Sequence, residues 1–159
     1  MDTTVELFKK AISGEVIASS FYSLASEVTK NDEARMVFLN LSTMEDDHAQ
    51  ELVKQCQKVF DPSEFDAQAF LNDLIKKDSG IDKITSDTIE NGSPAEVLEL
   101  AISLENAAKE TYDKLSMQVK DPEMKKYCQG LSDEEASHAL ELTNTLNSLD
   151  MDMEDRPGL

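Results

Sequence analysis

The feature that most constrains this 159-residue chain is an internal repeat with a period of 90 residues and no gap. Both halves contain a glutamate, a tyrosine seven residues later, and a Glu-x-x-His motif further on. These residues are Glu15, Tyr22, Glu45 and His48 in the first half, and Glu105, Tyr112, Glu135 and His138 in the second. A repeat of this kind indicates that one supersecondary unit occurs twice. We therefore expect two equivalent units that associate about a two-fold axis and bring their polar residues together.

Each unit is expected to be a pair of long helices. Apolar residues recur every three or four positions over about residues 3–30, 32–59, 93–120 and 121–149, which is the spacing of bundle helices. The third segment starts with Ser93-Pro94-Ala95-Glu96, a capping box with proline in the first turn, and the fourth starts with Asp121-Pro122. These patterns predict an all-α four-helix bundle.

The connections predict the topology. Tight turns near residues 30–31 and 120–121 make two antiparallel hairpins, and the stretch over about residues 60–92 is long enough to run back along the bundle as a crossover. We expect short helical turns in this crossover, because Phe65, Phe70, Leu71 and Ile75 resemble packing residues. The expected organisation is one domain over residues 1–150 and a flexible tail over residues 151–159.

Composition excludes several classes of partner. A formal net charge of −18 repels phosphate backbones and anionic lipid, so neither nucleic acid nor a membrane surface is expected to bind. No apolar run is long enough to cross a bilayer, and the N-terminus lacks the features of a signal peptide, so the expected location is cytoplasmic. Cys56 and Cys128 form no C-x-x-C motif, and we expect both to be buried free thiols.

The repeated polar residues predict a metal site with two ions. A glutamate and a histidine three residues apart share one helix face, so two such helices and one glutamate from each other helix supply four carboxylates and two imidazoles. Carboxylates can bridge two ions, and this oxygen-rich set favours iron or manganese, with zinc also possible. The competing interpretation is a polar core network or two unrelated surface histidines. Tyr22 and Tyr112 either orient ligand carboxylates or serve as aromatic core residues.

On these motifs the chain resembles the rubrerythrin-like branch of the ferritin-like di-iron proteins over about residues 3–149. The motifs are Glu15-x6-Tyr22, Glu45-Asp46-Asp47-His48, Glu105-x6-Tyr112 and Glu135-Ala136-Ser137-His138. The resemblance implies that Glu45 and Glu135 bridge two iron ions. It also implies that Glu15 and Glu105 are terminal ligands, one for each ion, and that His48 and His138 complete the two ions.

The same resemblance implies an oxidoreductase of the oxidative-stress response that reduces hydrogen peroxide or dioxygen, and a homodimer. Rubrerythrins use a rubredoxin-like domain with four cysteines as electron donor, so here an external donor such as a rubredoxin is expected. They also have one more glutamate ligand on the third helix, where this chain has Ile102 and Ala108. Ala18 and Ala108 leave room for a small oxidant. The alternative function is a ferroxidase or other iron-handling protein, or a binding module that the metal holds together.

Overall fold

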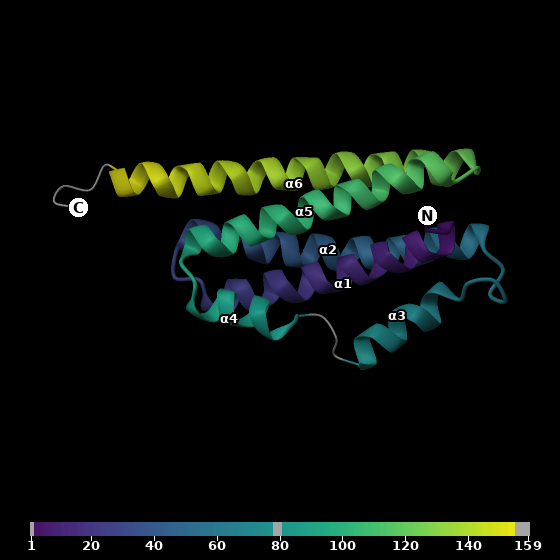
Figure 1. Ribbon diagram of the computed structural model, residues 1–159, viewed down its shortest axis with the longest axis horizontal. Coiled ribbons are helices and arrows are strands. Elements are labelled where there is room, and N and C mark those ends of the chain that lie inside the picture. The colour runs from purple at the N-terminus through teal and green to yellow at the C-terminus, as the bar shows by residue number, and fades with distance from the viewer. Residues whose placement is uncertain (1, 78–80, 155–159) are drawn as a thin grey trace.

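Four long helices form the body of the protein. The computed structural model describes residues 2–77 and 81–154. It contains α1 (Thr4–Val28), α2 (Asp32–Val59), α3 (Ala67–Lys76), α4 (Lys83–Asn91), α5 (Pro94–Gln118) and α6 (Pro122–Glu154), and no strand among these residues (Figure 1). The helical pairs α1–α2 and α5–α6 are the two hairpins expected from the repeat. The all-α prediction is confirmed.

Local sequence sets where the long helices begin. Thr3 and Glu6 form a capping box at α1, and Ser93 and Glu96 form the matching one at α5, where Pro94 occupies the first helical position. Such side chains satisfy backbone N–H groups that have no partner inside the helix. Before α6, the Asp121 carboxylate accepts a hydrogen bond of 2.9 Å from the backbone N–H of Met124. The two starts expected at Ser93 and Asp121 are therefore confirmed.

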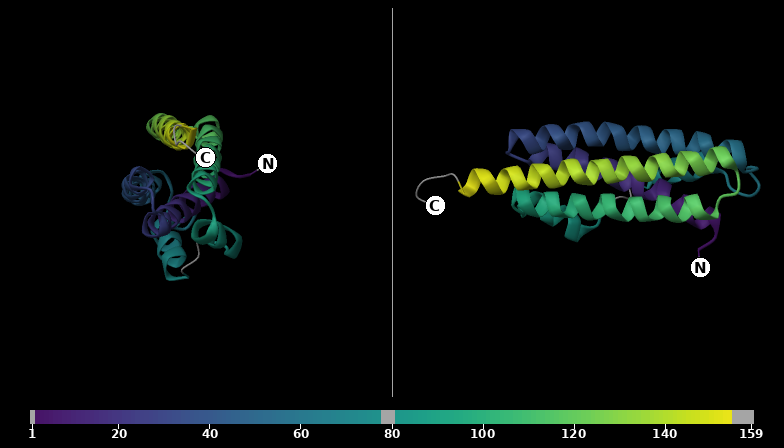
Figure 2. Two further views of the ribbon diagram at one scale, coloured as in Figure 1. Left: turned by 90° about the vertical axis from the view of Figure 1, so that its left-hand side faces the viewer. Right: turned by 90° about the horizontal axis from the view of Figure 1, so that it is seen from above.

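The crossover between the hairpins forms two complete helices, α3 and α4, where the sequence indicated only short helical turns. Both have an aspartate cap, because Asp66 accepts from the N–H of Ala69 and Asp82 accepts from the N–H of Thr85. The end-on view in Figure 2 shows that α3 and α4 lie outside the four long helices. Helix α3 contacts α1 and α2, and α4 contacts α1 and α5, so the crossover covers the α1 side of the bundle.

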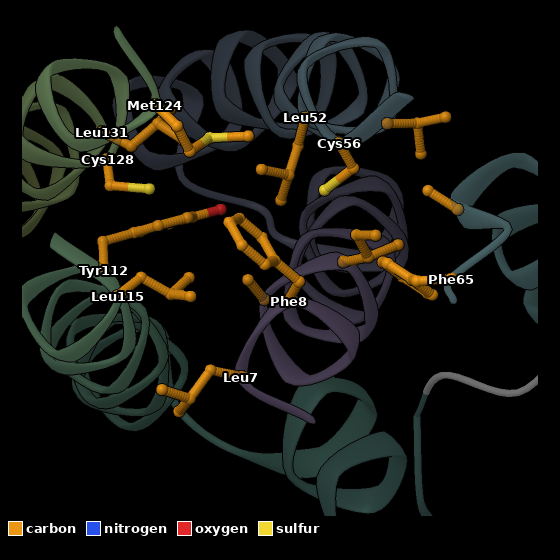
Figure 3. Close-up of a cluster of buried hydrophobic side chains, with 14 of the residues drawn as sticks. Leu7, Phe8, Leu52, Cys56, Phe65, Tyr112, Leu115, Met124, Cys128 and Leu131 are labelled. Carbon is orange, nitrogen blue, oxygen red and sulfur yellow. The ribbon is translucent and has the colours of Figure 1, made fainter. Parts of the chain in front are cut away.

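The hydrophobic core is divided into two clusters by a polar layer. One cluster contains Phe8, Leu52 and Leu115, and it includes Cys56 and Cys128 as buried free thiols, as expected (Figure 3). The other contains Phe21 and Phe38. On each long helix the predicted ligands fall between residues of the first cluster and residues of the second. The apolar clusters therefore hold the polar layer in the middle of the bundle.

Helix α6 extends further than expected. It continues to Glu154, four residues beyond the boundary at which the sequence suggested a flexible tail. The physical reason is that residues 151–154 contain good helix formers, and the first helix-breaking residues come later, at Pro157 and Gly158. Residues 155–159, the rest of the expected tail, lie outside the described residues. Among the described helices, none is both long and apolar enough to pass through a bilayer.

Candidate metal centre

The six predicted ligands meet in the polar layer between the two core clusters. Two overlapping groups of these side chains could each hold a metal ion, and within a group the ligand atoms lie within 4.8 Å of one another. The first group is Glu15, Glu45, His48 and Glu135, and the second is Glu45, Glu105, Glu135 and His138. Glu45 and Glu135 belong to both groups. This is the arrangement in which two carboxylates lie between two neighbouring ions.

Each helix supplies its ligands from one inward-facing stripe. Glu15 comes from α1 and Glu105 from α5, whereas α2 and α6 each supply a Glu-x-x-His pair. The four glutamates are all buried. The imidazole rings of His48 and His138 are nearly parallel, with an interplanar angle of 10° and 5.8 Å between their centroids. The two rings therefore stack with nearly parallel planes beside the carboxylates.

The buried polar atoms of the site converge without pairing. His48 Nδ1 lies 3.0 Å from Glu135 Oε1, and His138 Nδ1 lies 3.0 Å from Glu45 Oε1, yet neither pair has the alignment of a hydrogen bond. Among the described residues, seven buried side-chain atoms lack a hydrogen-bond partner: Glu15 Oε2, Glu45 Oε1, His48 Nδ1, Glu105 Oε2, both Glu135 oxygens and His138 Nδ1. Unpaired buried polar atoms are costly. Lone pairs aimed at common centres are what metal ions require, so this donor set fits two ions.

Burial changes the acidity of the carboxylates. Burial together with the neighbouring Glu15 raises the pKa of Glu45 to about 10. Burial raises the pKa of Glu105 to about 8, although His138 opposes it. Burial acts in the same direction on Glu135, but there the imidazoles of His138 and His48 outweigh it and lower the pKa to about 2. The metal-free site thus shares protons among carboxylates that cannot all be charged together.

The pKa values of both histidines are raised. Burial lowers the pKa of His48, but Glu135 and Glu15 outweigh it and raise that pKa to about 11. The pKa of His138 rises to about 12, because Glu105, Glu135 and Glu45 likewise outweigh burial. In the absence of metal, protons on the imidazoles therefore compensate the carboxylate charges. Metal ions would take over that compensation and displace the protons.

The two tyrosines connect the hairpins crosswise. The hydroxyl of Tyr22 in α1 donates a hydrogen bond of 2.6 Å to Glu105 Oε1 in α5, and the hydroxyl of Tyr112 in α5 donates one of 2.5 Å to Glu15 Oε1 in α1. Each tyrosine therefore contacts the glutamate of the other hairpin. The second carboxylate oxygen, Oε2, of both Glu15 and Glu105 has no hydrogen-bond partner and remains in the site. The spacing of seven residues placed both tyrosines near the carboxylates, but it did not predict the crossing.

A cavity reaches the carboxylates from the side of α1 and α5. Its volume is about 260 Å³, and Glu45, Glu105 and Glu135 are part of its wall. Small residues make up much of the rest, including Ala18 and Ala108, which were expected to leave room beside the site. Gly14 and Ala107 also line it and were not identified from the sequence. The cavity therefore places three buried carboxylates beside a space large enough for a small molecule.

One further acidic residue was missed in the sequence. Glu134 of α6 places Oε2 2.5 Å from His48 Nε2, the ring nitrogen that points away from the other carboxylates. Glu134 directly precedes the predicted ligand Glu135, and in so acidic a chain nothing distinguished it from a surface residue.

Comparison with known families agrees with this architecture. A family model described as a ferritin-like domain matches residues 3–148, which is most of the chain. Searches of curated proteins and of solved structures gave no match. The match confirms the broader family in the resemblance, and the rubrerythrin-like branch stays a prediction.

Proposed function

The chain belongs to the ferritin-like domain family, and on that premise we propose that it is a di-iron carboxylate oxidoreductase, with iron and manganese as the alternative metal pair. In this proposal it reduces hydrogen peroxide or dioxygen with electrons from an external donor. The observation that carries the proposal is that Glu45 and Glu135 belong to both groups of ligand atoms. A site of that form would hold two ions close enough to act on one small substrate.

The residues of the chain have distinct roles in this proposal. Glu45 and Glu135 hold both ions, Glu15 and His48 complete one position, and Glu105 and His138 complete the other. Tyr22 fixes the orientation of Glu105 and Tyr112 that of Glu15, and each of these two glutamates belongs to one of the two positions. When bound, redox-active ions supply the electrons that peroxide or dioxygen reduction requires.

The cavity between α1 and α5 supports a small substrate. The cavity is lined by small side chains and by Glu45, Glu105 and Glu135, so a molecule inside it would lie next to the proposed metal ligands. Peroxide and dioxygen are small enough for this space, and apolar clusters flank the site on both sides.

The rubrerythrin-like branch, the external donor and the homodimer are parts of the same proposal. Ile102 and Ala108 occupy the region where rubrerythrins have their additional glutamate, so the six ligands described here form the proposed set. Cys56 and Cys128 are buried in the apolar core, and two thiols cannot form a four-cysteine iron site. In this proposal the electrons come from an external donor such as a rubredoxin.

Turnover tests the proposed activity. The iron-loaded protein, reduced anaerobically, should be reoxidised by hydrogen peroxide within seconds and should repeat this over many cycles with a reductant. A single slow oxidation by dioxygen without turnover would support the alternative, an iron-handling ferroxidase, which the net charge of −18 favours because it attracts cations. Bound metal that neither reacts nor exchanges would contradict both functions and leave a structural metal site.

A matched pair of glycines tests the entry route. Gly14 lines the cavity and Gly130 does not, yet both are exposed helical glycines with nothing within 4 Å of an added Cβ atom. We expect Gly14→Leu to slow reoxidation by peroxide without changing metal content, and Gly130→Leu to change neither. Equal rates in the two variants would show that substrate enters elsewhere.

A further inference from the structure

The two proposed metal positions differ in what supports their histidine. His48 Nδ1 faces Glu15, Glu45 and Glu135 at 3.0–3.9 Å, so Nδ1 is the nitrogen available to a metal ion. His48 Nε2 points the other way and lies 2.5 Å from Oε2 of Glu134. The Glu134 side chain is 55% exposed, so it contacts the site from its solvent side.

The repeat shows what stands at the equivalent place in the other half. A shift of 90 residues places Glu134 on Met44, just as it places His138 on His48. Met44 is exposed on α2 and has no charged acceptor to offer His138. In the described part of the chain, the ion-pair contacts of His138 all run through Nδ1, to Glu45, Glu105 and Glu135. The six proposed ligands are symmetric, but the residues behind the two imidazoles are not.

We propose that Glu134 is a positioning residue that makes the position of Glu15 and His48 the tighter of the two metal positions. This inference rests on the proposed di-metal function. A carboxylate that accepts the Nε2 proton fixes the tautomer and the orientation of the ring and makes Nδ1 a stronger ligand. Loss of such a partner typically weakens metal affinity by about 10- to 100-fold. In the other half the repeat-equivalent residue is Met44, which cannot accept that proton, so the position of Glu105 and His138 should bind its ion more weakly.

The histidine content of the chain allows each position to be observed separately. The sequence has two histidines, one in each group of ligands, so each imidazole reports on one position. We would label histidine with ¹⁵N in the full-length, metal-free protein and follow both rings by NMR at free Zn²⁺ concentrations set by a chelator. In the unmodified protein His48 should reach half-saturation at a free Zn²⁺ concentration about 10-fold or more below that of His138.

Variants separate the role of Glu134 from a general effect of charge. Glu134→Ala should remove most of the difference between the two histidines, and Glu134→Gln, which keeps a neutral acceptor, should give an intermediate result. Met44→Glu should tighten binding at His138 alone. Asp133→Asn is the matched control, because it removes the same charge from a neighbouring exposed position of α6.

The outcomes distinguish this inference from the proposed function. Half-saturation of both histidines at the same Zn²⁺ concentration, or a difference that persists in Glu134→Ala, would overturn the role of Glu134 and leave the di-metal site intact. Failure of either imidazole to respond to Zn²⁺ would instead contradict the di-metal site itself. Far-ultraviolet circular dichroism of each metal-free variant should match the unmodified protein, because Glu134 and Met44 lie on the surface.

Discussion

At the scale of single residues, Glu45 and Glu135 differ from the other ligands because each belongs to both groups of ligand atoms. We predict that Glu45→Gln or Glu135→Gln abolishes binding of both ions. Glu15→Gln should weaken mainly the ion at His48, since Glu15 belongs to one group. Metal content after dialysis, measured by plasma emission spectrometry, checks both outcomes.

Asp46→Asn is the control for those variants, because Asp46 is adjacent to Glu45 but exposed. It should bind two ions, as the unmodified protein does. Two ions in Glu135→Gln would refute the shared role of that carboxylate.

The three tyrosines of the chain provide a test and its control. Tyr22 and Tyr112 each donate a hydrogen bond to a buried glutamate, whereas Tyr127 is half-buried and has no such bond. Phenylalanine preserves the ring but leaves the carboxylate oxygen unsatisfied, which costs about 1–3 kcal/mol. We predict a loss of that size in the free energy of unfolding for Tyr22→Phe and for Tyr112→Phe in metal-free protein, measured with urea. Tyr127→Phe should change it by less than about 0.5 kcal/mol.

At the scale of helices, α1 and α6 each contain an exposed glycine away from their ends. Gly14 and Gly130 both have open space where a Cβ atom would be. Alanine restricts the unfolded chain and favours the helix, so Gly14→Ala and Gly130→Ala should each raise the free energy of unfolding by about 0.5–1 kcal/mol. Thermal unfolding of the metal-free variants checks this, and a decrease would mean that the helix packs against something at that position.

The helices were the part of the fold that the sequence predicted best. Stripes of apolar residues and the caps at Ser93 and Asp121 act within one or two turns, so they can be recognised without knowledge of the tertiary structure. The crossover was predicted less well. Helices α3 and α4 are short, and they pack against the long helices α1, α2 and α5, which the local pattern does not contain.

At the scale of the whole molecule, the proposed ions connect the two hairpins. Each group of ligand atoms combines three residues of one hairpin with one residue of the other, so separation of the hairpins on unfolding would break up both groups and release both ions. We predict that metal loading raises the unfolding temperature, with about 2.7 kcal/mol of stabilisation per position at a free metal concentration 100 times the dissociation constant. Calorimetry with and without a chelator measures the effect, and an unchanged unfolding temperature would contradict a site shared between the hairpins.

The metal-free protein should lose stability as the pH rises from about 6 to 9. The pKa values of His48, His138, Glu45 and Glu105 are all raised in the folded state, so that state binds more protons than the unfolded chain in this range. Stability falls with pH wherever the folded state holds more protons. Glu135, whose pKa is lowered, acts in the opposite direction only below about pH 5.

Unfolding temperatures at several pH values, with chelator present, check the sign of this effect. The decrease in unfolding temperature with rising pH should be smaller in Glu45→Gln, because glutamine cannot bind the proton that Glu45 binds in the folded state. Metal-loaded protein should show a weaker dependence, because the ions replace the protons.

The six predicted ligands could be found from the sequence because the repeat marks them twice. A single Glu-x-x-His in an acidic chain carries little information, but two in register, with a matched glutamate and tyrosine, define one symmetric site. Glu134 could not be found in this way, since it breaks the symmetry that identified the others. The crosswise partners of Tyr22 and Tyr112 also require the packing of α1 against α5, which the spacing within a helix does not show.

Those crosswise hydrogen bonds bear on how such a chain could have arisen. One hairpin contains every kind of group that the site uses, but its tyrosine serves the glutamate of the other hairpin, so a hairpin alone is incomplete. Two identical copies of a peptide half this length could complete each other as a homodimer. A duplication that fused them would give a chain with this repeat. On this view, the difference between Met44 and Glu134 records divergence of the two halves after the fusion.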